Sequence, residues 1–158
     1  MVLLIYFLAN LAILLYFLKF QRENLFPLEI FTYWIVSTIV FQNYSAFFYM
    51  NIKHFIIHEN LSIEMTHLIN RIVLIPVITL IFLNNYVNLT TIKKKIAFIF
   101  LIIIIFGCIE MLSHITGVLI HKNWNFWWSL IFWFIYILIA ILLLKYFRIK
   151  MAKGVYRP

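Results

Sequence analysis

The sequence predicts an all-α bundle of about five transmembrane helices, on the basis of its composition, its hydrophobic pattern and its length. Of the 158 residues, 66% are hydrophobic and 11% are charged, whereas a soluble domain carries about 25% charged residues. Residues 101–106 are continuously apolar, whereas membrane barrel strands alternate apolar and polar residues. A helix crosses the hydrocarbon with about 20 residues, so the chain fits about five spans in a single transmembrane domain. A soluble globule, a disordered chain and a disulfide scaffold are excluded.

The first two predicted spans begin near the N-terminus. The first ends at Lys19, and the second follows Pro27, which is tolerated in the first turn of a helix. All five predicted spans cover residues 2–18, 30–50, 66–86, 96–119 and 126–144, followed by a basic tail over 145–158.

The third span is the least clearly defined by composition. Its continuous apolar core is only residues 72–83, and it contains Pro76, so a re-entrant segment is an open alternative. The fourth span is strongly apolar until Glu110. For the fifth span, Asn125 is a candidate N-cap, and neighbouring tryptophans are typical of the membrane interface.

The basic residues predict the orientation of the chain. Ten lysines and arginines lie in the first loop, the third loop and the tail, whereas Lys53 and Lys122 are the two in the other loops. The positive-inside rule therefore places the N-terminus outside and the C-terminus in the cytoplasm. The net charge of +8 is interpreted as contact with anionic lipid heads at the cytoplasmic face, and not as a nucleic-acid interface.

With this orientation, the polar residues of the last four spans gather in their outward halves. Polar groups in a membrane usually face one another or water. We therefore predict a hydrated pocket that opens outward and has an apolar floor on the cytoplasmic side. The predicted pocket residues are Gln42, Asn43, His67, Asn70, Arg71, Glu110 and His114, and a predicted outer turn contains His121, Asn123, Trp124, Asn125 and Ser129.

Glu110 is the most informative of these polar residues, because it lies about 13 Å from the outer end of its predicted helix. A glutamate is too short to reach water over that distance, so a partner is expected. The sequence favours a Glu110–Arg71 pair, with His67 and His114 facing each other above it. The alternative is an Arg71 that extends to the surface and a Glu110 that is protonated or hydrogen-bonded.

A metal site is a second hypothesis for the same region. Glu64 and His67 have the i, i+3 spacing of carboxylate-bridged helical bundles. With His114 and His121 they are candidate ligands for zinc, manganese or iron. A second such motif is missing, however, and Arg71 would oppose a cation, so interfacial histidines are the simpler interpretation and no cofactor is predicted.

Three motifs carry a resemblance to a known family: residues 76–83 (PVITLIFL), the mid-helix Glu110, and residues 121–129 (HKNWNFWWS). In these the chain resembles an uncharacterised family of small multi-pass membrane proteins of low-GC Gram-positive bacteria. The resemblance covers roughly residues 60–135, and Asn123 replaces a glycine of the family's turn. It implies residence in a bacterial plasma membrane and a similar topology, but it supplies no substrate.

Three classes of function are compatible with these observations. A non-catalytic binding or assembly subunit is favoured, because catalytic spacings are missing and the predicted bundle is small. An intramembrane enzyme acting on lipid or peptide, with or without a metal, would use Glu110 as its acid or base. A small transporter subunit is disfavoured by the apolar cytoplasmic halves. Besides the bilayer, the expected partners are a membrane protein or a second copy of this chain.

Overall fold

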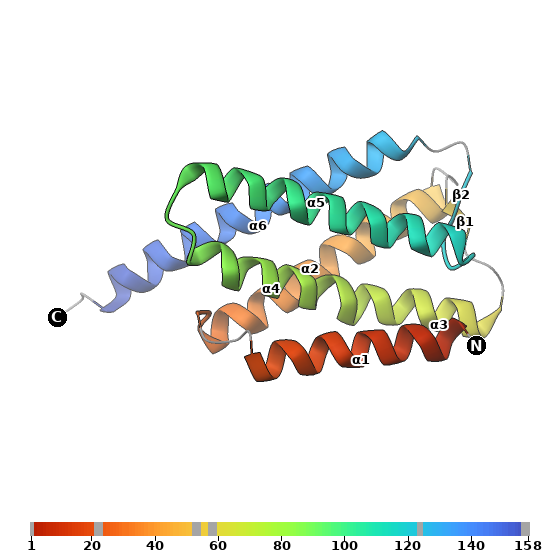
Figure 1. The fold of residues 1–158 in the computed structure, drawn as a ribbon, viewed down its shortest axis with the longest axis horizontal. Helices are drawn as coiled ribbons and strands as arrows, with labels where there is room; N and C mark the ends of the chain where they lie inside the picture. The colour runs from red at the N-terminus through yellow and green to blue at the C-terminus, as the bar shows by residue number, and fades with distance from the viewer. Residues whose placement is uncertain (1, 21–23, 52–54, 57–59, 123–124, 156–158) are drawn as a thin grey trace.

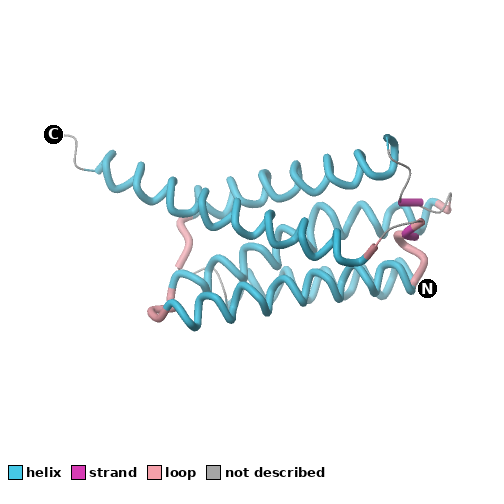
Figure 2. Tube along the Cα trace, turned by 90° about the horizontal axis from the view of Figure 1, so that it is seen from above, coloured by secondary structure: helices cyan, strands magenta, loops and turns pink. Residues whose placement is uncertain are grey.

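The computed structural model describes residues 2–20, 24–51, 55–56, 60–122 and 125–155. Over these ranges the chain forms an up-and-down bundle of helices, as Figures 1 and 2 show. The helical segments are α1 (Val2–Phe20), α2 (Pro27–Ala46) with the π-helical turn η1 (Phe47–Asn51), α3 (Leu61–Ile69), η2 (Asn70–Leu74), α4 (Ile75–Val87), α5 (Ile92–Ile115) and α6 (Phe126–Val155).

The predicted all-α transmembrane bundle is confirmed. Four segments are long and apolar enough to cross a membrane: Val2–Phe20, Leu61–Val87, Ile92–Ile115 and Phe126–Lys150. The more polar α2 runs along the same bundle and packs against α4 (Figure 1). The chain is therefore a multi-pass α-helical membrane protein.

Several helix ends differ from the predicted boundaries; for example, α2 begins at Pro27 and not at residue 30, and α5 begins at Ile92 and not at 96. Three further ends differ for a local reason. The third span begins at Leu61 and not at residue 66, because the side chain of Asn60 accepts a hydrogen bond from the Ser62 N–H and caps it. The fourth ends at Ile115 and not at 119, at a turn described below. The fifth continues to Val155, because lysine and arginine are good helix formers and extend the helix beyond its apolar part.

The predicted third span, which comprises α3, η2 and α4, is one continuous helical segment of 27 residues, so it is not re-entrant. Its middle is a π-helical turn, in which the Ile75 N–H bonds to the carbonyl of Asn70. Pro76 follows directly, and a proline inside a helix removes one backbone hydrogen bond. The wider turn accommodates this disruption, and such turns often occur at functional sites.

Helix α4 is the centre of the bundle, because it contacts α1, α2, α5 and α6. Val77, Leu80 and Leu83 on α4 have no exposed surface. At this level the Thr79 hydroxyl lies 2.7 Å from the Tyr136 hydroxyl of α6. Thr79 on α4 therefore faces protein and not lipid.

At the end of the bundle that holds the α5–α6 connection, α5 terminates in a Schellman turn. Gly117 has a φ of +72°. Its N–H bonds to the His114 carbonyl, and the Val118 N–H bonds to the Ser113 carbonyl. The chain then turns back toward the bundle, where Val118 and Leu119 are buried. This reversal brings the next residues over the polar side chains of α5.

Replacing Gly117 by alanine is expected to lower the free energy of unfolding by about 1 kcal/mol, because an L-residue in the left-handed region is strained. A Cβ at this position would meet nothing within 4 Å, so the loss reports the backbone alone. Unfolding of the purified protein in mixed micelles measures it. Gly117→Asn should lose less, because asparagine tolerates this conformation. Equal stability of both variants and the parent would contradict the prediction.

Candidate functional site

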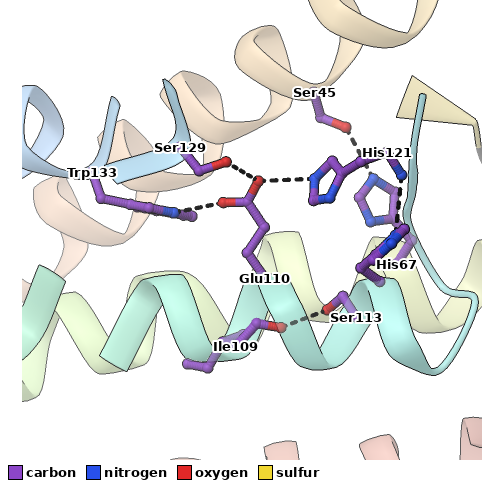
Figure 3. Close-up of polar contacts among 9 residues, drawn as sticks. Ser45, His67, Ile109, Glu110, Ser113, His121, Ser129 and Trp133 are labelled. Carbon is purple, nitrogen blue, oxygen red and sulfur yellow. Dashed lines mark hydrogen bonds and ion pairs between the residues drawn. The ribbon is translucent and has the colours of Figure 1, made fainter. Parts of the chain in front are cut away.

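Glu110 lies inside the bundle with 4% of its surface exposed, and three side chains converge on it (Figure 3). Its Oε1 accepts a hydrogen bond from the Ser129 hydroxyl at 2.6 Å and lies 3.0 Å from Nε2 of His121. Its Oε2 accepts a hydrogen bond from the Trp133 indole N–H at 2.7 Å. Both carboxylate oxygens are therefore bonded within the chain, and we call these four residues the Glu110 cluster.

Helix α6 supplies two of the donors. Ser129 and Trp133 are four residues apart and so share one face of the helix. Upstream, the side chain of Asn125 accepts a hydrogen bond from the Trp127 N–H at 3.2 Å, consistent with its predicted capping role. The short distance from this cap fixes Ser129 in the first turns of α6, directly opposite Glu110.

Two aromatic rings hold the indole of Trp133 in place. It stacks on Phe106 of α5 at 4.5 Å and on Phe41 of α2 at 5.2 Å between ring centroids. Phe106 precedes Glu110 by one helical turn, so the ring that positions the indole and the carboxylate that receives its N–H come from one face of α5. Packing against Phe41 and Phe106 thus fixes the direction in which the Trp133 N–H points.

The third contact comes from the turn after α5. His121 belongs to β2 (Ile120–His121), which pairs in antiparallel fashion with β1 (Phe55–Ile56), with Phe55 opposite His121. The His121 N–H donates to Nδ1 of His114 at 3.2 Å. The Glu110 cluster therefore ties the α5–α6 connection to the bundle, and through β1 it also reaches the α2–α3 connection.

The cavity beside Glu110 has a volume of about 20 Å³ and is bordered by His67, Asn70, Ser113 and Trp133 among others. One water molecule needs about 10–15 Å³ by this kind of measure, so the cavity fits at most one. The prediction of a hydrated pocket open to the outside is therefore wrong at Glu110. The folded-back turn and α6 fill the space that the sequence assigned to water.

The predicted pair between Glu110 and Arg71 is also wrong. Among the described residues, no hydrogen bond or ion pair joins them, and the buried Nε of Arg71 has no partner. Arg71 lies beside Glu64 and His67 in an open hollow of about 250 Å³ on the surface of α3 and η2. The prediction used the similar depth of Glu110 and Arg71 in their helices, but depth does not determine the direction in which a side chain points around its helix.

The two histidines predicted to face each other have separate partners. Nε2 of His67 lies 2.9 Å from the Ser45 hydroxyl of α2, whereas the exposed His114 contacts His121. Their rings do not form the predicted layer above Glu110, because the α5–α6 turn carries His121 into that position.

Asn70 was predicted in the pocket and lies next to a residue that the sequence interpretation missed. Its Oδ1 accepts a hydrogen bond from Nδ2 of Asn10 at 3.0 Å, and both side chains are buried. The signal was present, since Asn10 is the one amide in an otherwise apolar α1. Gln42 and Asn43 are exposed, and Asn43 donates a hydrogen bond to the Ile39 carbonyl of its own helix.

Asn123 and Trp124 of the predicted outer turn lie outside the described residues. Within the described ranges, no group of three or more histidine, cysteine, aspartate or glutamate side chains is placed to hold a metal ion. The candidate ligands Glu64, His67, His114 and His121 are divided between two surfaces, because Glu64 is exposed on α3 whereas His121 faces Glu110.

A second buried carboxylate lies at the opposite end of the bundle. Glu29 of α2 has no exposed surface, and its oxygens accept hydrogen bonds from Arg148 at 3.1 and 3.3 Å and from the Phe26 N–H at 3.0 Å. The Arg148 guanidinium also donates to the Asn24 carbonyl at 2.8 Å. This ion pair was not predicted, because Glu29 and Arg148 lie just outside the predicted second and fifth spans and therefore beyond the predicted apolar floor.

Over the residues that the structure describes, fold and site together define a polytopic α-helical membrane protein with a buried, hydrogen-bonded carboxylate near each end. Comparison of the chain with protein-family models, with curated proteins and with solved structures gives no match. The resemblance to small membrane proteins of low-GC Gram-positive bacteria stays a prediction.

Proposed function

We propose that this chain is a non-catalytic binding or assembly subunit of a bacterial plasma membrane, with its N-terminus outside and its C-terminus in the cytoplasm. The observation that carries the proposal is the saturation of Glu110 by Ser129, Trp133 and His121 beside a cavity of about 20 Å³. A carboxylate bonded in this way holds the α5–α6 connection in place, and the cavity beside it is too small for a substrate.

The surface that this arrangement supports lies at the outer end of α6. Trp127 and Trp128 lie in the first turn of that helix with 69% and 59% of their surfaces exposed. Tryptophan is enriched both at membrane interfaces and in the binding hot spots of proteins. Because the Glu110 cluster fixes the start of α6, these two side chains are presented in one defined position.

An enzyme is the second candidate, because a serine and a histidine both contact Glu110. Ser129 has no exposed surface, however, and its hydroxyl points at the carboxylate, as does Nε2 of His121. A nucleophile needs a substrate carbon about 3 Å away, and the cavity is too small to admit one. A transporter is opposed by the fully buried apolar side chains of α4 between the two carboxylates.

The proposal is tested by placing a photo-crosslinking amino acid at Trp127 or Trp128 in living cells. We expect one protein adduct, identified by mass spectrometry, that is formed at these positions. The matched control positions are Ile135 and Leu142, which are exposed further along α6 and should yield no such adduct. The adduct should weaken in Glu110→Gln, at unchanged protein level, because the start of α6 is then less well fixed.

Three outcomes would overturn the proposal. The first is the absence of a protein adduct at both tryptophans. The second is stoichiometric zinc, manganese or iron in the purified protein, which would favour the metal-assisted enzyme. The third is reaction of cysteines placed at Val77 and Leu80 with aqueous reagents, which would reveal a water path through the bundle centre.

A further inference from the structure

A long apolar groove lies between α1, α4 and α5 and has a volume of about 920 Å³. On α5 its wall extends from Phe98 to Ile109, which is about 16 Å of helix. The hydrocarbon core of a bilayer is about 30 Å thick, so the groove has the length of about one leaflet. Its shape therefore suits a lipid acyl chain lying parallel to the helices.

Polar groups are found at only one end of the groove. Asn85 and Asn88 line it where α4 ends. Lys94 and Lys95 lie in the first turn of α5 at the same end, four and three residues before Phe98, so they share the groove face of that helix. Neither lysine borders the groove directly, and the Lys95 ammonium lies 5.4 Å from the centre of the Tyr86 ring. The apolar channel therefore ends at two amide groups with the two lysines nearby, where the α4–α5 connection lies (Figure 1).

We propose that this groove binds one anionic phospholipid, with an acyl chain between α1, α4 and α5 and the phosphate at Lys94, Lys95 and Asn88. A second copy of this chain fits the groove less well. The net charge is +8, and two copies in the same membrane orientation would bring their lysine-bearing ends together. A zwitterionic lipid would fill the channel but would leave the two ammonium groups without a net negative partner.

Two pairs of variants separate the acyl-chain site from the head-group site. Ala12 of α1 lines the groove and is exposed, so Ala12→Phe fills the channel, whereas Leu11→Phe adds a ring to exposed α1 surface on another face of that helix. K94Q/K95Q removes the two charges at the groove. K145Q/K150Q removes two exposed lysines from α6 and serves as the matched control.

The experiment measures retention of dioleoyl phosphatidylglycerol and dioleoyl phosphatidylcholine by the full chain in native mass spectrometry. We expect one phosphatidylglycerol, held about tenfold or more tightly than phosphatidylcholine. K94Q/K95Q should abolish this preference and K145Q/K150Q should keep it. Ala12→Phe should weaken retention of both lipids, and Leu11→Phe should not.

Three results would overturn the inference. One is equal retention of the two lipids by the parent protein. Another is the same loss of preference in K145Q/K150Q as in K94Q/K95Q, which would indicate a general effect of charge. The third is efficient disulfide-linked dimerisation of Ala12→Cys in membranes, which would show that a second copy occupies the groove.

Discussion

Replacing Glu110 by alanine is expected to lower the free energy of unfolding by about 2–4 kcal/mol. The change leaves the Ser129 hydroxyl and the Trp133 indole N–H buried without their acceptor, and each such group costs about 1–3 kcal/mol. Hydrogen bonds between membrane helices contribute less, about 0.6 kcal/mol on average, so we take the lower part of the summed range. Reversible unfolding in mixed micelles or bicelles measures the difference.

The matched control is Glu64→Ala. Glu64 is exposed on α3, so its removal should change the free energy of unfolding by about 0.5 kcal/mol or less. Glu110→Gln should lie between the two, because one amide oxygen still accepts a hydrogen bond while the amide nitrogen meets donors. If Glu110→Ala is no more destabilising than the control, the cluster does not stabilise the fold.

The contacts within the cluster are tested by a double-mutant cycle. Ser129→Ala combined with Glu110→Ala should cost less than the sum of the single changes, since both remove the same 2.6 Å hydrogen bond. Arg71→Ala combined with Glu110→Gln should be additive, because the two residues are not joined. Additivity in the first cycle would contradict the geometry of the cluster.

The helices followed from the sequence because membrane insertion demands long apolar runs, which a sequence displays directly. Helix ends were less accessible, because caps decide them: Asn60 extends α3, and Gly117 terminates α5. The capping role of Asn125 was predicted correctly, since an N-cap depends on local sequence alone. Local rules thus gave the elements and part of their boundaries.

The partners of Glu110 could not be predicted in the same way. Depth along each helix suggested Arg71, but the rotation of each helix about its axis is set by packing, here by the stacking of Trp133 between Phe41 and Phe106. His121 reaches the site through a chain reversal and a strand pair outside any span. The signal in the sequence was the spacing of Ser129 and Trp133, which places two hydrogen-bond donors on one face of the predicted fifth span.

Buried polar residues near the other end of the bundle were missed for a different reason. Counting lysines and arginines by loop assigned Arg148 to a tail that contacts lipid heads, so it was not considered as a partner for Glu29. The helix continues past the predicted end, which carries Arg148 alongside the start of α2. A charge count by side of the membrane gives topology but not pairing.

The largest expected effect at that end is that of Arg148→Ala, about 2–4 kcal/mol of unfolding free energy. Removing one partner of a buried ion pair leaves an uncompensated charge, which usually costs about 3–5 kcal/mol. Here the side chain of Arg148 is 32% exposed, so water reaches part of the pair and reduces the loss. Equilibrium unfolding measures it, with Lys150→Ala as a control on an exposed residue of the same helix.

Two further variants distinguish charge from geometry in this pair. Arg148→Lys should recover only part of the loss, because a single ammonium group cannot bond to both Glu29 and the Asn24 carbonyl as the guanidinium does. Glu29→Gln with Arg148→Ala should be less destabilising than the sum of the single changes, since the buried carboxylate charge is then gone. Full recovery by lysine would show that charge alone matters. It would also remove the reason to regard Arg148 as the link between the end of α6 and the α1–α2 connection.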